Sequence, residues 1–79
     1  MRILILGGGA VGTLVARRLI GEKNEVTIVE KDEARCVLLQ EMLDAKIVQG
    51  SASSISALER ADLAHAEMLI AVTNSDETN

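Results

Sequence analysis

The segment GGGAVG, residues 7–12, constrains the fold of this chain more than any other part of its sequence. It follows four apolar residues, Ile3 to Leu6, and it precedes a segment in which apolar residues recur with helical spacing. Gly7, Gly9 and Gly12 have the spacing Gly-x-Gly-x-x-Gly, which permits a tight turn, the approach of a pyrophosphate and close helix packing, in that order. A strand, a glycine-rich turn and a helix in this succession are typical of a β-α-β unit that binds a dinucleotide.

Four short segments rich in Ile and Val predict β-strands, and three longer segments between them predict helices. The predicted strands are residues 2–6, 25–30, 46–49 and 68–72. Apolar residues spaced by three and four positions mark the helices: Val11, Leu14, Val15 and Leu19, then Ala34, Leu38, Met42 and Leu43, then Ile55, Leu58 and Ala61. The helix ends are predicted from Gly21 as a stop, Asp32 as a cap, and Ser56 with Glu59 as a capping box.

The predicted elements alternate as β-α-β-α-β-α-β, which indicates the α/β class and a Rossmann-like fold. Because crossovers between parallel strands are right-handed, this alternation predicts a parallel sheet with helices on both faces. Residues 3–6 are all apolar, as expected of a central strand covered on both sides, and the predicted strand order is 3-2-1-4. The ending TNSDETN resembles a loop and the first turn of a further helix. We therefore expect residues 1–79 to be the N-terminal part of one nucleotide-binding domain, truncated relative to a full Rossmann-like domain.

The composition argues against several classes of function. The 79 residues make one small domain at most, and its core must be aliphatic because Phe, Tyr and Trp are absent. A net charge of −4 and the lack of aromatic stacking platforms argue against a nucleic-acid partner. With one cysteine, Cys36, and one histidine, His65, neither an internal disulfide nor a metal cluster is expected. No segment approaches the ~20 apolar residues of a membrane span, and we expect a cytosolic chain.

Glu30 makes the glycine motif a more specific prediction. It ends the second predicted strand, about 20 residues after Gly9, where dinucleotide-binding units carry the acid that binds a ribose. A carboxylate there accepts hydrogen bonds from both ribose hydroxyls and repels a 2′-phosphate, which favours NAD(H) over NADP(H). The pyrophosphate would meet the amide groups and the partial positive charge at the start of the first helix. Lys31 and Arg35 leave open the alternative that this loop binds a phosphate.

The sequence also resembles a known family in three stretches: GGGAVG, VTIVEKD and the ending VQGSASSISALERADLAHAEMLIAVTNSDETN. It is similar there to the N-terminal domain of the Trk-type potassium-uptake regulatory proteins, of the KTN or RCK class. The resemblance covers essentially the whole chain, and IAVTNSDETN is its most specific part. It implies a non-enzymatic regulatory subunit on the cytoplasmic side of the cell membrane, which binds NAD(H) or else ATP or ADP. It further implies a membrane potassium transporter as partner and a homo-oligomer in the full-length protein.

The resemblance also implies positions for the nucleotide-binding residues, which are carried over from the family by position. Those at the phosphates would be Gly7, Gly9, Ala10, Val11 and Gly12. Glu30 with Lys31 would bind the adenosine ribose. The loop after the third strand, Gly50, Ser51 and Ala52, would border the adenine, and Thr73 with Asn74 would face the rest of the ligand. Many relatives carry Asp at the position of Ser51, whose hydroxyl can still hydrogen-bond the base.

Two other functions stay open at the level of the sequence. The same β-α-β signature begins many dehydrogenases, so the chain can be the cofactor half of an NAD-dependent oxidoreductase. Against that alternative, these residues contain no candidate acid-base pair; His65 is interpreted as a surface residue and Cys36 as an unreactive helix residue. The third possibility is a structural domain whose cleft is empty.

Overall fold

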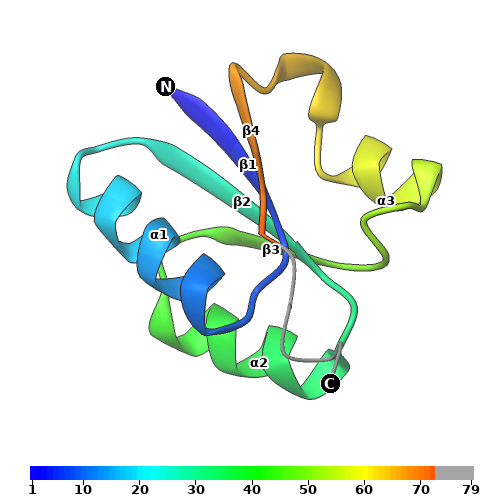
Figure 1. Cartoon of the computed structure of the whole chain (residues 1–79), viewed down its shortest axis with the longest axis horizontal. Helices are drawn as coiled ribbons and strands as arrows, with labels where there is room; N and C mark the ends of the chain where they lie inside the picture. Colours follow the sequence, from blue (N-terminus) through cyan, green and yellow to red (C-terminus); the bar gives the residue numbers. More distant parts are fainter. Residues whose placement is uncertain (73–79) are drawn as a thin grey trace.

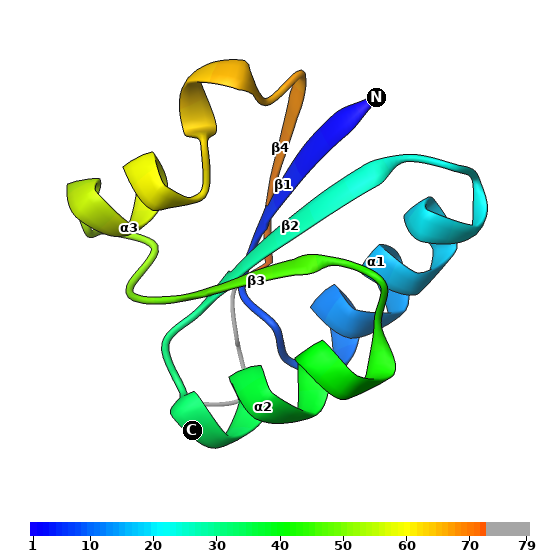
Figure 2. The same ribbon diagram turned by 180° about the vertical axis from the view of Figure 1, so that it is seen from behind.

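The computed structural model describes residues 1–72 of the chain as one four-stranded sheet with helices on both faces (Figures 1 and 2). The elements are β1 (Arg2–Leu6), α1 (Ala10–Gly21), β2 (Glu25–Glu30), α2 (Glu33–Met42), β3 (Lys46–Gln49), α3 (Ile55–Arg60), a 3-10 turn η1 (Leu63–His65) and β4 (Met68–Ala71). The predicted alternation of strands and helices is therefore confirmed. None of the helices within this described part has the length and apolar character needed to span a membrane.

All strand pairs are parallel, and the strand order is β3-β2-β1-β4, as predicted. The central strand β1 lies between β2 and β4, so that Ile5 is in register with Ile28 on one side and Ile70 on the other. Helices α1 and α2 lie on one face of the sheet and α3 on the opposite face (Figures 1 and 2). This Rossmann-like arrangement brings the carboxyl ends of all four strands to one edge of the sheet.

The core has one apolar layer on each face of the sheet. The layer under α1 and α2 consists of Ile3, Ile5, Ala16, Val26, Ile28, Leu39 and Leu43. The layer under α3 consists of Leu4, Val29, Val48, Ala57 and Ala61. Alternate residues of β1 enter the two layers because successive side chains of a strand point to opposite faces. This explains why β1 is apolar at every position from Ile3 to Leu6.

The predicted apolar faces of the helices are partly wrong. Leu14, Leu38 and Ile55 are 66%, 55% and 74% exposed, and Met42 is also exposed. Helix α1 instead buries the smaller residues Gly12 and Ala16 against the sheet, whereas α2 buries Cys36 together with the large residue Leu39. Small residues let a helix axis approach the strands closely, so the large apolar residues at the neighbouring helical positions are left facing outward.

The predicted helix ends also need correction. Asp32 caps α2 as predicted, since its carboxylate accepts a hydrogen bond from the Arg35 amide at 3.1 Å. The cap of α3 is Ser54 and not the predicted Ser56, because the helix begins two residues earlier than a cap at Ser56 would require. The Ala57 amide donates to Ser54 Oγ at 3.3 Å. Helix α1 includes Gly21, and the left-handed residue that follows it is Lys23, with φ of 71°.

Candidate functional site

A cleft of about 830 Å³ lies at the carboxyl ends of the strands. The β1–α1 turn forms its floor, and the loops after β2 and β3 and the end of β4 form its sides. Its lining residues are Leu6, Gly7, Gly8, Gly9, Ala10, Val11, Val29, Glu30, Lys31, Asp32, Arg35, Gly50, Ser51, Ala52, Ser53, Ala71 and Val72. Ligands of open α/β sheets bind at this edge, where the connections leave the sheet in opposite directions.

Most of the residues predicted for the site come together in this cleft. They are Gly7, Gly9, Ala10, Val11, Glu30, Lys31, Gly50, Ser51 and Ala52. Gly12 is not among the lining residues, because it packs beneath the turn. Thr73 and Asn74 lie outside the described residues. The lining also includes residues that the sequence did not assign to the site, notably Gly8, Asp32 and Ser53.

Two glycines of the motif are required by the fold of the turn itself. Gly7 has a φ of +109°, which L side chains rarely adopt, and a Cβ there would lie 2.5 Å from the carbonyl oxygen of Val72. At Gly12 a Cβ would collide with the carbonyl oxygen of Gly7, so only glycine lets α1 start this close to the turn. The turn is tied to both neighbouring strands, since the Gly7 amide donates to Val29 O at 2.8 Å and Val72 donates to Leu6 O at 2.9 Å.

Gly9 differs from these glycines because the space beside it is open. Among residues 1–72, a Cβ at this position would meet no atom within 4 Å. Gly9 is the N-cap of α1, yet no side chain caps this helix and its first turn carries no acidic residue. The first amide groups of a helix need acceptors, and together with the helix dipole they attract an anion. The turn at Gly9 is therefore open to a ligand and electrostatically suited to a phosphate.

The carboxylate of Glu30 is held in place beside the glycine turn. Its Oε1 accepts a hydrogen bond from the Gly8 amide at 2.7 Å, and its Oε2 accepts one from the Asp32 amide at 2.8 Å. The residue is half-buried at the end of β2. Because an ionised carboxylate has about four acceptor positions, these two bonds leave capacity for two further donors.

Gly8 is a residue of the site that the Gly-x-Gly-x-x-Gly spacing does not explain. It is buried, and a Cβ there would lie 2.6 Å from Leu39 Cδ1 and 3.2 Å from Glu30 Oε1. Its carbonyl oxygen accepts from Thr13 Oγ1 at 3.2 Å and from Arg35 Nη1 at 3.4 Å. Side chains from α1, β2 and α2 thus fix the two peptide groups on either side of Gly8. The signal in the sequence is that Gly8 is the middle one of three consecutive glycines, and the Gly-x-Gly-x-x-Gly spacing does not require a glycine there.

The loop after β3 is joined to the same acid through its backbone. The Gly50 amide donates to the carbonyl oxygen of Glu30 at 2.9 Å, and a Cβ at Gly50 would lie 2.5 Å from Ala57 Cβ. The Cys36 thiol donates to the same carbonyl at 3.3 Å from within the protein. Burial, and then the nearby charges of Glu30, Asp32 and Glu33, raise the pKa of Cys36, which makes it a poor nucleophile.

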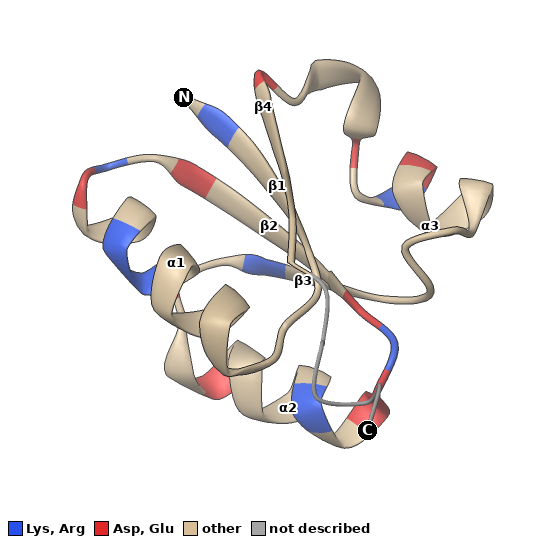
Figure 3. Cartoon of the chain, viewed as in Figure 1, with Lys and Arg blue, Asp and Glu red and all other residues tan. Residues whose placement is uncertain are grey.

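Charge is distributed unevenly around the cleft. The glycine turn carries no charged side chain, whereas the connection from β2 to α2 alternates between acidic and basic residues (Figure 3). Glu30, Lys31 and Asp32 are consecutive, and Arg35 follows in the first turn of α2. Within residues 1–72, no group of three or more His, Cys, Asp or Glu residues is arranged to hold a metal ion.

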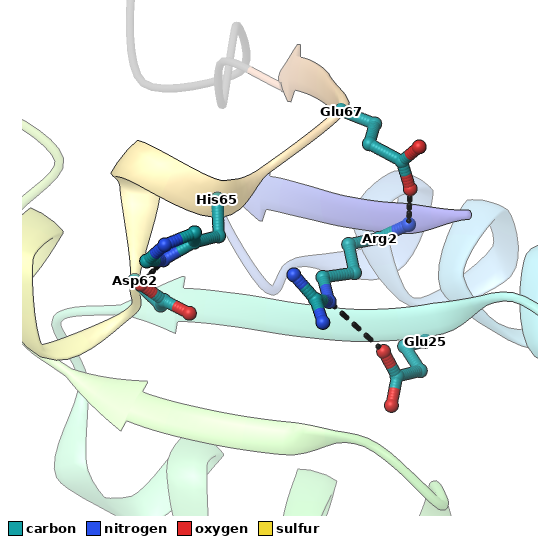
Figure 4. Close-up of polar contacts among 5 residues, drawn as sticks. All are labelled: Arg2, Glu25, Asp62, His65 and Glu67. Carbon is teal, nitrogen blue, oxygen red and sulfur yellow. Dashed lines mark hydrogen bonds and ion pairs between the residues drawn. The ribbon is translucent and has the colours of Figure 1, made fainter.

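A second hollow, of about 910 Å³, lies at the opposite, amino edge of the sheet. Some of the polar groups at this edge are paired with one another (Figure 4). Arg2 Nε donates to Glu25 Oε1 at 3.4 Å, its amide donates to Glu67 at 2.7 Å, and His65 Nδ1 lies 2.6 Å from Asp62 Oδ1. The hydrogen bond with His65 lowers the pKa of Asp62. The side chains of Arg2, Glu25, Asp62 and His65 are thus engaged in contacts within the protein.

A parallel sheet of order 3-2-1-4, with a glycine-rich first turn and an acidic residue after the second strand, defines the class of Rossmann-like α/β domains. Within this class, the chain belongs to the TrkA-N domain family, whose family model matches residues 3–79.

Curated relatives of the chain come from bacteria and archaea. It is 47% identical to the Trk system potassium uptake protein TrkA of Vibrio alginolyticus and 46% identical to that of Haemophilus influenzae, over 79 residues in each case. It is 37% identical to a Trk system potassium uptake protein TrkA homolog of Methanothermobacter thermautotrophicus. All of this chain is covered in each comparison, but the chain spans only 17% of the two bacterial relatives and 37% of the archaeal one.

Proposed function

We propose that the carboxyl-edge cleft binds an adenine nucleotide, with NAD(H) as the favoured ligand and ATP or ADP as the alternative. The observation that carries this proposal is the fixed carboxylate of Glu30 beside an open, uncapped helix start. The two groups match the two chemically distinct parts of a nucleotide, a ribose diol that donates hydrogen bonds and a phosphate that accepts them.

The proposed pose follows from the order of groups along the ligand. The pyrophosphate lies over Gly9, where the backbone is unobstructed, and accepts from the first amides of α1. The adenosine ribose then reaches Glu30, whose unused acceptor positions receive the two hydroxyls. The adenine continues between the loop after β2 and the small residues Gly50, Ser51 and Ala52. Thr73 and Asn74 remain proposed contacts for the rest of the ligand.

For the full-length protein we propose a regulatory subunit of a potassium uptake system, located at the cytoplasmic face of the membrane and not an enzyme. The names of the relatives support a role in potassium uptake. These relatives are much longer than this chain. The proposed partner is a membrane potassium transporter, and the proposed assembly is a homo-oligomer. The second candidate, the cofactor half of an NAD-dependent oxidoreductase, rests on the shared β-α-β signature alone.

Regulation requires that the nucleotide favour one conformation over another. A ligand in the cleft would contact the β1–α1 turn, which is hydrogen-bonded to the ends of both β2 and β4. It would thereby affect how these ends sit relative to one another. A tenfold change in transport requires a difference in binding free energy of about 1.4 kcal/mol between the two conformations. One or two hydrogen bonds to a moving loop suffice for a preference of this size.

The ligand proposal is tested by calorimetric titration of NADH, NAD, ATP and ADP into the full-length protein. We expect saturable binding of NADH, and Gly9→Ala serves as the binding-deficient control. Absence of binding by all four nucleotides would contradict the proposal.

The regulatory proposal is tested separately in a reconstituted potassium transporter. Potassium flux is measured with and without the protein and NADH, while NADH absorbance is followed in the presence of candidate substrates. We expect flux to change and NADH to be conserved. Steady consumption of NADH without an effect on flux would favour the oxidoreductase instead.

A further inference from the structure

We propose that Arg35 is a second specificity-determining residue of the cleft and can bind a 2′-phosphate. In the wild-type protein the negative charge of Glu30 repels that phosphate and so prevents Arg35 from binding it. This inference rests on the proposed nucleotide site and adds the residue that sets its tolerance of NADP(H). In this arrangement, discrimination between NAD(H) and NADP(H) depends on the charge of one carboxylate and not on the shape of the cleft.

Glu30 and Arg35 both bind the backbone of one residue, Gly8. Glu30 Oε1 accepts from the Gly8 amide at 2.7 Å, and Arg35 Nη1 donates to the Gly8 carbonyl oxygen at 3.4 Å. Both side chains line the cleft. The acidic and the basic group are therefore on the same side of the proposed ribose, within reach of substituents on its 2′-carbon.

The position of Arg35 is fixed by its element as well as by this contact. It lies in the first turn of α2, and its own amide donates to the capping carboxylate of Asp32 at 3.1 Å. Its guanidinium has five N–H donors, of which the Gly8 carbonyl takes one. Lys31 also lines the cleft, but it precedes the helix. Arg35 is therefore the better-oriented cation for a phosphate.

Within residues 1–72, Arg35 forms no ion pair that would neutralise its charge. Among residues 1–72, the ion pairs within 4.0 Å join Arg2 to Glu25, Arg18 to Glu22 and His65 to Asp62. Arg35 is exposed and forms none within this part of the chain. A guanidinium that faces a cleft with most of its donors uncommitted matches the bidentate geometry by which arginine recognises phosphate.

The two residues act in opposite directions on a 2′-phosphate. The carboxylate of Glu30 accepts from a 2′-hydroxyl but repels a 2′-phosphate, whereas an arginine at this point of a dinucleotide site accommodates that phosphate. With Glu30 ionised, NAD(H) is preferred. Once the charge of Glu30 is removed, Arg35 is no longer opposed, and the preference moves toward NADP(H).

The test measures the ratio of NADPH to NADH affinity in variants of the full-length protein. Glu30→Gln keeps an acceptor for the Gly8 amide and removes the charge, and we expect the ratio to rise by about tenfold or more. Adding Arg35→Gln to Glu30→Gln should reverse that rise, and adding Arg35→Lys should reverse it only in part. Adding Arg17→Gln, an exposed arginine of α1 that does not line the cleft, should leave the ratio unchanged.

The ratio separates this inference from the proposed function. If wild-type protein binds NADH but the Glu30→Gln and Glu30→Gln/Arg35→Gln variants have the same ratio, Arg35 is not a phosphate receptor and the nucleotide site stands. A general loosening of the turn would weaken the binding of NADH and of NADPH equally and leave the ratio of their affinities constant. That result would also overturn the inference. If wild-type protein binds neither dinucleotide, the proposed function falls and this inference falls with it.

Discussion

The β1–α1 turn and the first turn of α1 together contain four glycines, and the consequence of an added Cβ differs among them. At Gly7 and Gly12 it would collide with backbone, and at Gly8 it would press on Leu39 and Glu30. Only at Gly9 does it meet nothing within 4 Å. Three of these glycines are thus required by the packing of the protein, and beside the fourth is room that no residue from 1 to 72 fills.

We therefore predict that Gly9→Ala abolishes nucleotide binding while the circular dichroism spectrum and the melting temperature stay close to those of the wild type. A Cβ at Gly9 points into the open cleft, where the pyrophosphate is proposed to lie. Gly12→Ala is the matched comparison, because its Cβ would collide with Gly7 O and should lower the stability of the fold. Unfolding of Gly9→Ala would show that this glycine is structural.

Glu30→Gln should weaken NADH binding by about 1.5 to 3 kcal/mol, the range for a hydrogen bond to a charged group. The amide side chain can still accept from the Gly8 amide, but it loses the bond from Asp32 and the charge that strengthens the ribose contacts. Calorimetry provides the dissociation constants. Glu33→Gln, in the first turn of α2 and outside the cleft lining, is the control. An unchanged constant for Glu30→Gln would exclude this residue from the site.

Cys36 should make stability fall at alkaline pH. In the folded protein its pKa is raised above the ordinary value of 9.0, chiefly by burial. The thiol's contribution to the free energy of unfolding is therefore complete below that pH and is lost as the pH rises toward the folded pKa. The chain has no tyrosine to titrate in the same window. Urea unfolding between pH 7 and about pH 10 should therefore show a shallower decline for Cys36→Ala than for the wild type. Parallel declines would mean that burial does not shift this thiol.

At the scale of elements, the start of α3 distinguishes two neighbouring serines. Ser54 Oγ accepts from the Ala57 amide, whereas Ser56 lies inside the helix. Ser54→Ala should cost about 1 kcal/mol of unfolding free energy, the usual effect of removing an N-cap, and Ser56→Ala should cost less. Denaturant titration of the two variants measures the difference. Equal losses would mean that the Ser54 cap does not stabilise α3.

The existence and order of the elements were predictable from the sequence, but the faces of the helices were not. The Ile- and Val-rich strands have no competing interpretation between their turn residues, so their bounds agree with the structure to within one residue. In the helices, Leu14 and Leu38 fit an apolar stripe as well as their smaller neighbours do. In α1 the close approach of the helix to the sheet favours the small Ala16, and in α2 the buried face contains Cys36 and Leu39 in place of Leu38.

At the scale of the whole molecule, the sequence predicted most of the cleft because the parallel topology collects the ends of the strands at one edge. The sequence could not predict contacts between side chains and backbone atoms that are distant along the chain. The bonds from Glu30 and Arg35 to Gly8 span 22 and 27 positions of the chain, and no local pattern encodes them. They depend on the register of β1 against β2, which is known only once the sheet is assembled.

A buried and an exposed leucine on neighbouring strands should contribute unequally to the free energy of unfolding. Leu4 is 1% exposed in the layer under α3, whereas Leu69 is 52% exposed on the neighbouring strand β4. Leu4→Ala should lower the unfolding free energy by about 2 to 5 kcal/mol, and Leu69→Ala by less than about 1 kcal/mol. Urea denaturation of the full-length protein measures both. Similar losses would mean that the side chain of Leu69 is covered in the complete protein.

The pairing of β1 with both β2 and β4 has a consequence for synthesis on the ribosome. The first strand to emerge receives its second neighbour only after Met68 to Ala71 have been made, and the hydrogen bond from Val72 to Leu6 forms later still. Until then the nascent chain carries an apolar strand with one unpaired edge, a form of intermediate prone to aggregation. The carboxyl-edge cleft, whose lining includes Val72, is completed in the same late step. Competence to bind should therefore arise with the closure of the sheet and not before it.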